Sequence, residues 1–356
     1  MSKSEVDRSK NYRRIRRRDL LAGTAAGIAA LGLGRLPGSV AHAIDYVEAP
    51  AKAVGISAYQ DGGHVFVRWN NTIAIGYRAN QSLKYPYFAP LMGPVTGLSL
   101  TTESSLPYPH HRGLWLGCEP LNEGDFWSDG SLQTGQIRST DLRVESANDS
   151  VVVIHDACEW IRQQSSPLKD RRRFAFSVPS ERIRLLDVEI DLTAREDLRI
   201  DHAKHSFFAL RAAADISPIH GGTLMNSSGA VGAADTFGQP ASWCGYFGQR
   251  DRSDVVEGIA ILNHPDNFGG DCPWFTRNYG HLSPSPFNFL STPWVLERGA
   301  TLALRYCVVL HAGTPQQADL EGIYKQWVNG DGWFISMRKS STGQFAGPIS
   351  SALEKE

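Results

Sequence analysis

Short runs of apolar and β-branched residues recur along most of this chain and are separated by turn residues. Apolar and polar positions alternate in several of them, most clearly near the end of Arg182–Leu192. A period of two residues is typical of a β-strand with one buried and one exposed face. The pattern predicts antiparallel strands at His64–Trp69, Val151–His155, Arg173–Val178, Arg182–Leu192, Ser206–Arg211, Gly258–Asn263 and Leu302–Leu310.

A helical period occurs only late in the chain. Four apolar residues there share one side of a helix, at positions i, i+3, i+4 and i+7: Leu320, Ile323, Tyr324 and Trp327. The sequence Thr314-Pro315-Gln316-Gln317 before them has the residue types of an N-cap, a first turn and a capping box. With many short strands, 34 glycines and 19 prolines, the chain is expected to form an all-β fold, a large antiparallel β-sandwich with one C-terminal helix.

Residues 1–43 have the organisation of an export signal. Arg17 and Arg18 form a twin-arginine pair, the uncharged run Leu20–Leu33 follows, and Ala41-His42-Ala43 fits an A-x-A cleavage site. The uncharged run is shorter than the roughly 20 residues that span a bilayer. We expect export by the twin-arginine route to the periplasm or the cell exterior. A single domain is then expected over residues 44–328, followed by a loosely ordered tail over 329–356.

Charge and cysteine content narrow the function classes. Without residues 1–43 the chain loses nine of its 36 basic and three of its 37 acidic residues, which leaves a net charge of about −7. No basic stripe remains for nucleic acid, and no later segment is apolar enough to span a membrane. The five cysteines include no CxxC pair, so most are expected to be buried and structural.

Candidate chemistry is concentrated in the run Pro109–Gly117. His110 and His111 have side chains that act as acids or bases near neutral pH, and Arg112 can bind a carboxylate or paired hydroxyls. The alternative is a loop held together by hydrogen bonds from these side chains to the backbone. Adjacent histidines in a strand point to opposite faces, so one metal rarely takes both, and we assign no metal ligand. His110 and His111 are therefore catalytic candidates and Arg112 a substrate-binding one.

Two neighbouring segments add polar candidates. Asp125 is the first choice among the nearby carboxylates for a base or an orienting group, ahead of Glu119 and Glu123. Lys204 and His205 enter the predicted strand Ser206–Arg211, where they either bind substrate or are solvated strand-end charges. The same segment contains His202.

Further candidates lie late in the chain or are aromatic. His264 follows the strand Gly258–Asn263 and is a third catalytic histidine candidate. Asn226 and Arg277 are expected to contact substrate hydroxyls or a carboxylate; Asn278, Tyr279 and His281 follow Arg277 in the same loop. Trp127 and Trp243 are expected to stack on a sugar ring, although core packing is the commoner role of tryptophan.

Several catalytic signatures are missing. The sequence contains no GxSxG elbow, no HExxH motif and no P-loop, so nucleophilic serine chemistry has no support. The paired carboxylates of ordinary glycosidases are not evident either, which favours elimination or an unusual hydrolase.

Several motifs taken in order resemble those of the PmoA-like domain family, whose function is largely unknown and which is often labelled methane oxygenase. The resemblance covers roughly residues 85–312 and is carried by Pro86–Leu91, Pro109–Trp115, Asn122–Trp127, Lys204–Arg211, Gly221–Gly229, Ala241–Cys244, Asn263–Pro265 and Pro284–Phe287. It implies an exported bacterial protein of sugar-degrading neighbourhoods, with a mutarotase-like or jelly-roll-like sandwich. A membrane monooxygenase subunit needs several spanning helices, and none is predicted here after the signal.

The leading hypothesis is an exported carbohydrate-active enzyme that acts on a glycoside or modified sugar by hydrolysis or β-elimination. Its ligand is a small molecule or an oligosaccharide, and no cofactor is assigned. A sugar-binding protein without catalysis is the alternative, and a metal-dependent oxygenase is a weaker one. The sugar, the bond and the oligomeric state do not follow from the sequence.

Overall fold

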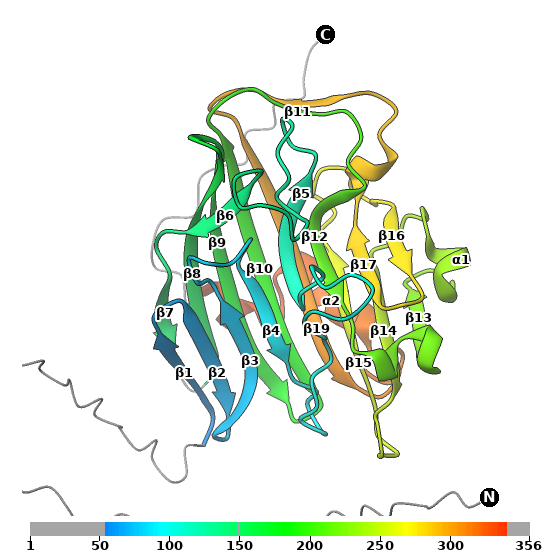
Figure 1. Ribbon diagram of the computed structural model, residues 1–356. Helices are drawn as coiled ribbons and strands as arrows, with labels where there is room; N and C mark the ends of the chain where they lie inside the picture. The colour runs from blue at the N-terminus through cyan, green and yellow to red at the C-terminus, as the bar shows by residue number, and fades with distance from the viewer. Residues whose placement is uncertain (1–53, 148–149, 340–356) are drawn as a thin grey trace, which may run out of the picture. The chain divides into compact units, whose positions relative to one another are not determined.

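The computed structural model describes residues 54–147 and 150–339 (Figure 1). The chain divides into the units Met1–Glu48 and Ala49–Glu356, and every described residue belongs to the second unit. The expected export signal at 1–43 lies outside the described residues.

Within the described part, two large antiparallel sheets form. The first has eight strands in the order β1-β2-β3-β4-β5-β12-β17-β16. Their bounds are β1 Ile56–Asp61, β2 His64–Trp69, β3 Thr72–Arg78, β4 Tyr87–Leu91, β5 Leu114–Glu119, β12 His205–Arg211, β17 His281–Pro284 and β16 Trp274–Arg277.

The second sheet has nine strands among the described residues, in the order β13-β14-β15-β19-β10-β9-β8-β6, with β7 paired to β8. Their bounds are β13 Thr223–Asn226, β14 Trp243–Gln249, β15 Val256–Asn263, β19 Thr301–Ala312, β10 Ile183–Ala194, β9 Ser165–Ser180, β8 Val151–Arg162, β6 Gln136–Ser139 and β7 Arg143–Ala147. A separate pair joins β11 Leu198–Ile200 to β18 Trp294–Leu296.

The two large sheets pack face to face through aromatic side chains. Tyr77 of the first sheet lies 5.2 Å from Phe174 of the second, and Phe208 stacks on Tyr306 at 4.5 Å between ring centroids. Residues of both sheets form one buried apolar cluster. The predicted large antiparallel β-sandwich is confirmed, and β2 coincides with the strand predicted at His64–Trp69.

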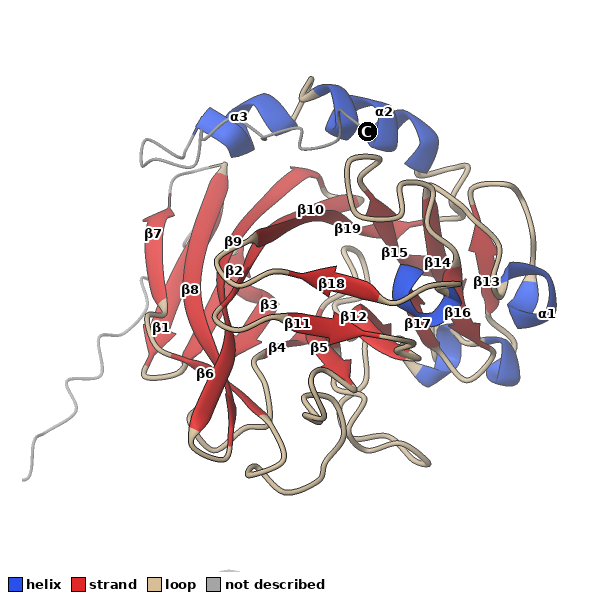
Figure 2. Ribbon diagram, turned by 90° about the horizontal axis from the view of Figure 1, so that it is seen from above, coloured by secondary structure: helices blue, strands red, loops and turns tan. Residues whose placement is uncertain are grey.

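Part of the second sheet is buried on both faces, because helices cover part of its outer side (Figure 2). Alternate residues of β8 enter two different cores: Val152 packs between the sheets, whereas Val151 packs in a cluster with the C-terminal helices α2 (Leu320–Asn329) and α3 (Phe334–Lys339). This explains why β8 begins with the continuous apolar run Val151–Ile154, which does not alternate.

The C-terminal helix forms where its apolar period predicts it, with two differences. Thr314 and Gln317 make the expected capping box, but the turn they close ends at Asp319, whose φ of 53° breaks the helix and whose side chain caps α2 instead. The ordered fold also continues beyond the expected boundary at 328. Phe334 and Met337 of α3 are buried against the second sheet, so the tail predicted from 329 contains a packed helix.

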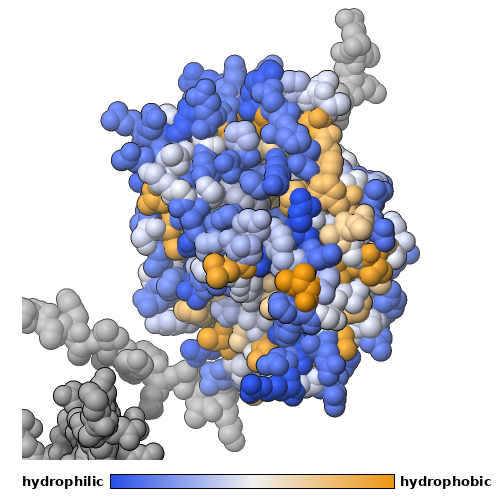
Figure 3. All heavy atoms as spheres, turned by 45° about the vertical axis from the view of Figure 1, so that its right-hand side comes forward, coloured by the Kyte–Doolittle hydropathy of each residue, from blue (hydrophilic) through white to orange (hydrophobic). Residues whose placement is uncertain are grey.

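The remaining short helices occur in connections. They are α1 Gly232–Thr236, η1 Ala214–Ile216, η2 Pro218–His220 and η3 Pro286–Phe289. No helix of the described residues is long and apolar enough to cross a membrane. On the face shown in Figure 3, hydrophobic residues form several separate patches among hydrophilic ones. All five cysteines are buried and free, whereas the sequence predicted burial for most of them.

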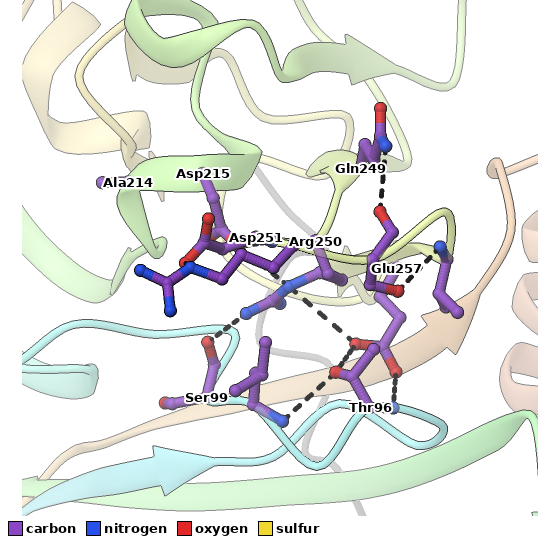
Figure 4. A network of polar contacts seen from close by, with 12 residues as sticks. Thr96, Ser99, Ala214, Asp215, Gln249, Arg250, Asp251 and Glu257 are labelled. Carbon is purple, nitrogen blue, oxygen red and sulfur yellow. Dashed lines mark hydrogen bonds and ion pairs between the residues drawn. The ribbon is translucent and has the colours of Figure 1, made fainter.

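A buried polar network holds the long connection between β4 and β5 (Figure 4). The Glu257 carboxylate accepts hydrogen bonds from the backbone N–H of Val95 at 2.7 Å and of Thr96 at 3.0 Å, and from the Thr96 hydroxyl. Arg250 lies 3.9 Å from Glu257 and donates to the Ser99 carbonyl at 2.8 Å. The connection is therefore anchored to the second sheet before it reaches the histidines at 110 and 111.

Candidate functional site

Four neighbouring strands of the first sheet present polar and aromatic side chains on one face. In the register, Glu119 of β5 lies opposite His205 of β12, and Arg211 of β12 lies opposite His281 of β17. Directly opposed residues of an antiparallel pair point to the same face. Because Phe208 points toward the second sheet, the alternation places His205 and Arg211 on the other, outer face. We call this outer surface of β5, β12, β17 and β16 the histidine face.

The loop before β5 folds over the histidine face. His111 stacks on His281 at 4.5 Å and on Trp115 at 5.4 Å between ring centroids, and it is only 4% exposed. Tyr108 packs 5.2 Å from His111 and lies at the surface. Gly113 has a φ of 60°, and a Cβ there would lie 2.0 Å from the Phe88 carbonyl oxygen, so only glycine allows this turn into β5.

Asp125 organises the neighbouring loop. Its carboxylate accepts hydrogen bonds from the backbone N–H groups of Trp127 at 2.9 Å and Ser128 at 2.8 Å, and from the Ser128 hydroxyl. Lys84 lies 3.9 Å away. Burial raises the pKa of Asp125, but these hydrogen bonds outweigh it and the net pKa is lowered. A carboxylate with its oxygens engaged in this way positions Trp127 and is a poor base.

Trp127 is buried under the histidine face and does not present an exposed ring for stacking. It is 1% exposed, and the ring of His205 stacks on it at 5.3 Å with planes 14° apart. A sugar stacking directly on this indole would have to displace His205. Tyr108 and Tyr279, which lie 5.2 Å apart, are the aromatic rings accessible at this face.

His205 and Glu119 form a hydrogen-bonded pair at the surface. His205 Nδ1 lies 3.2 Å from Glu119 Oε2, and the side chains are 28% and 36% exposed. Since a carboxylate accepts, Nδ1–H donates and Nε2 is left as the acceptor. Burial lowers the pKa of His205 and Glu119 opposes this shift, so the imidazole is neutral at pH 7. A neutral imidazole oriented by a carboxylate is the arrangement of a general base.

The other histidines of the face are less suited to proton transfer. Burial, together with His110 and Arg211, lowers the pKa of His111 to about 2. Burial also holds the pKa of His281 well below its usual range. Burial lowers the pKa of His110 too, although Asp129 opposes the shift. His111 therefore fits a neutral hydrogen-bonding role better than the acid–base role expected from the sequence.

Four cationic side chains surround this cluster. Arg112 pairs with Asp129 at 2.9 Å. Lys204 Nζ lies 5.8 Å and Arg277 Cζ 4.1 Å from the centroid of the Phe275 ring. Arg211 Cζ lies 4.6 Å from the centroid of Tyr279.

Several buried donors of the histidine face have no hydrogen-bond partner within the described part of the chain. They are Trp115 Nε1, Trp127 Nε1, His111 Nδ1, His281 Nδ1 and the Nε and Nη1 atoms of Arg211. Buried polar atoms in folded proteins are nearly always satisfied by protein, water or ligand. Their concentration here is what a site that binds a polar molecule requires.

Three of the candidates lie away from the histidine face. His264 stacks edge-on against Trp327 of α2, and Trp243 belongs to the cluster beneath the same helices. Asn226 is buried, and its side-chain oxygen accepts from the backbone N–H groups of Ser228 and Ala230. The structure thus brings together His110, His111, Arg112, Trp127, Lys204, His205 and Arg277, but not His264, Trp243 or Asn226.

Sequence reasoning left out part of the site. Arg211 and Tyr108 were not singled out, and Tyr279 and His281 were noticed only as neighbours of Arg277. The sequence contained a signal for Tyr279 and His281. They lie with Arg277 at the turn of one hairpin, and the second strand of this hairpin pairs with β12. Among the described residues, no group of three or more His, Cys, Asp or Glu side chains is arranged to hold a metal ion.

A surface hollow elsewhere has no comparable chemistry. It has a volume of about 510 Å³, and Trp69, Arg182 and Arg184 are among its lining residues. Arg184 donates to the Met92 carbonyl at 2.8 Å, so its guanidinium is engaged in holding the chain. The histidine face remains the best candidate site.

The family model described as a family of unknown function (DUF6807) matches residues 58–325. The chain belongs to this family. The resemblance to the PmoA-like family was therefore wrong: short shared motifs suggested it, whereas the match over most of the chain is to DUF6807. No curated protein matches the sequence.

Solved structures with some likeness include a polysaccharide lyase, at 10% identity and a TM-score of 0.30 over 75% of this chain and 34% of that one. A galactose mutarotase related enzyme from Lactobacillus acidophilus gives 9% identity and a TM-score of 0.30 over 72% of this chain and 97% of that one. The chain thus spans about a third of the length of the lyase.

Proposed function

We propose that the described domain is a carbohydrate-active enzyme whose reaction begins with proton abstraction by His205. The observation that carries the proposal is the His205–Glu119 pair, at 3.2 Å, on a face with accessible tyrosines and uncompensated cations. Neutral His205 receives the proton at Nε2, and Glu119 holds the ring and stabilises the imidazolium that forms.

Elimination fits this site better than ordinary glycoside hydrolysis. Hydrolysis by the usual route needs two carboxyl groups that flank the bond. Here Asp125 is engaged by the loop it organises, Asp129 pairs with Arg112, and Glu119 orients His205. In the proposed step the base removes a proton from a sugar carbon, and that electron pair forms a carbon–carbon double bond. The bond from the adjacent carbon to the leaving oxygen breaks, and this oxygen takes up a proton.

His110 is proposed to form a hydrogen bond with the leaving oxygen, which takes its proton from water. It is half-buried, and its ring lies 4.5 Å from that of His111. Arg112 is fixed by Asp129 and would contact hydroxyls of the same substrate.

The test is turnover of a panel of neutral and acidic oligosaccharides, followed by mass spectrometry. Elimination yields products whose masses sum to that of the substrate, whereas hydrolysis adds one water. We expect His205→Ala to lower kcat/KM by about 10²- to 10⁴-fold, the usual contribution of a general base. The control His64→Ala alters a histidine on β2, away from the histidine face, and is expected to keep full activity.

Two results would contradict the proposal. Products whose summed mass exceeds that of the substrate by one water would show that the reaction is hydrolysis and not elimination. Saturable binding of an oligosaccharide with no turnover by the wild-type chain would indicate a sugar-binding protein without catalysis.

A further inference from the structure

Charge is divided across the histidine face. Glu119 and Asp129 lie toward His110 and His205, and their charges oppose the lowering of the pKa of His110. Toward the buried histidines, Arg211 and Lys204 contribute to lowering the pKa of His111, and Arg211 and Arg277 to lowering that of His281. Lys204 directly precedes His205 and contributes to lowering the pKa of His205 as well. The face therefore has an acidic end beside His110 and a cationic end that extends from Lys204, next to His205, to the buried histidines.

The cations at that end are not neutralised by the protein. Within the described residues, Lys204, Arg211 and Arg277 contact aromatic rings and backbone carbonyls but no carboxylate. Arg211 is buried, and its Nε and Nη1 atoms have no partner in the described chain. By contrast, Arg112 at the acidic end has Asp129. A buried cation without a counter-charge, such as Arg211, is costly, so this end is suited to an anion that arrives from solution.

We propose that Lys204, Arg211 and Arg277 bind the carboxylate of an acidic sugar, which makes hexuronic acid residues the substrate class. This rests on the function proposed above. A guanidinium binds a planar carboxylate through two parallel N–H donors, and the exposed Lys204 adds a charge at the entrance.

The chemistry of such a substrate matches the arrangement. The carbon that carries the carboxylate holds the proton that His205 removes. As that proton leaves, negative charge spreads onto the carboxylate oxygens, where the cations stabilise it. The electron pair then forms the double bond to the adjacent carbon, and the glycosidic oxygen on that carbon leaves and takes a proton from water. The proton on His205 returns to the solvent. No further reactant is needed.

The experiment measures binding of methyl glucuronide and methyl galacturonide to the full chain by calorimetry or ligand-observed NMR. Methyl glucoside and the uncharged uronamides are the neutral comparisons, and glucose 6-phosphate and glucose 6-sulfate are the other anions. We expect at least one uronide to bind ten times more tightly than its amide and more tightly than the phosphate or sulfate.

Lys204→Gln and Arg277→Gln are the variants, because these side chains are exposed or half-buried and their loss should leave the fold intact. Each is expected to weaken uronide binding about tenfold, which corresponds to about 1.4 kcal/mol. The binding of methyl glucoside should not change. Lys169→Gln, an exposed lysine on β9 of the second sheet, is the matched control and should behave as wild type.

The outcomes separate this inference from the proposed function. Equal affinity for uronide and uronamide, tighter binding of phosphate or sulfate, or no binding of any uronide overturns the inference. Turnover of a neutral oligosaccharide that depends on His205 would leave the proposed function standing. If no sugar were bound or turned over, both the uronide inference and the proposed function would be wrong.

Discussion

At the scale of single residues, burial decides what each histidine does. His205 lies at the surface beside a carboxylate and is suited to accept a proton. His111 and His281 stack on each other in the buried part of the face, and their low pKa values keep them neutral. His264 packs against Trp327, away from these rings. The sequence shows all of these as histidines near strand ends, so their separate roles depend on contacts that only the fold creates.

The buried His281 predicts a loss of stability in acid. Its pKa in the folded chain lies well below the value of about 6.5 in the unfolded chain. Below pH 6.5 the unfolded chain therefore binds a proton that the folded chain does not, and the free energy of unfolding falls by about 1.4 kcal/mol per pH unit. We expect His281→Phe to reduce the drop in Tm between pH 7.5 and pH 5.0 by about 4 °C.

Thermal unfolding at the two pH values measures this. His220→Phe, which alters an exposed histidine, serves as the control and should leave the drop unchanged. An undiminished drop in His281→Phe would show that this ring is not the source of the acid sensitivity.

At the scale of elements, regular patterns were predictable and irregular connections were not. The alternation of apolar and polar residues predicted β2 and most of β10, and the helical period of apolar residues predicted α2. The course of the β4–β5 connection depends on Glu257, which lies more than 150 residues away. No local sequence pattern predicts such a long-range contact. The sequence therefore predicted Pro109–Gly117 as a candidate site segment without showing that it folds over β12 and β17.

Loss of this anchor should destabilise the chain. Glu257 is fully buried and accepts from two backbone N–H groups beside Arg250. In Glu257→Gln the amide oxygen can keep the two backbone hydrogen bonds at the Oε1 position, but the N–H₂ group then faces the Thr96 hydroxyl and Arg250, which loses a counter-charge. Breaking a buried pair of this kind costs about 3–5 kcal/mol. At about 2 °C per kcal/mol for a domain of this size, Tm should fall by about 6–10 °C.

Differential scanning calorimetry measures the effect. Glu181→Gln, which alters an exposed carboxylate, is the control and should shift Tm by less than about 1 °C. A Tm for Glu257→Gln within that margin would mean that the connection is held by other contacts.

At the scale of the whole described unit, two sets of polar and aromatic residues lie on the outer sides of different sheets. The histidine face lies on the outer side of the first sheet, whereas His264 and Trp243 lie with α2 and α3 on the outer side of the second. From the sequence, His264 was a third catalytic histidine candidate and Trp243 a sugar-stacking one, beside His110 and His111. That reasoning could not tell which sheet a strand joins, and β15, which precedes His264, pairs with β14 and β19 of the second sheet.

This separation gives the last prediction. His264→Ala removes a buried ring beside Trp327, so it should lower Tm by several degrees through lost packing. Measured well below its Tm, the variant should keep kcat/KM and uronide affinity within about twofold of wild type, because the first sheet and the interior between the sheets isolate the histidine face from it. His205→Ala should show the reverse, with little change in Tm and a large loss of kcat/KM, since its partly exposed ring contributes to chemistry more than to packing. A loss of turnover in His264→Ala comparable to that in His205→Ala would place the reaction on the second sheet and contradict the histidine face as the site.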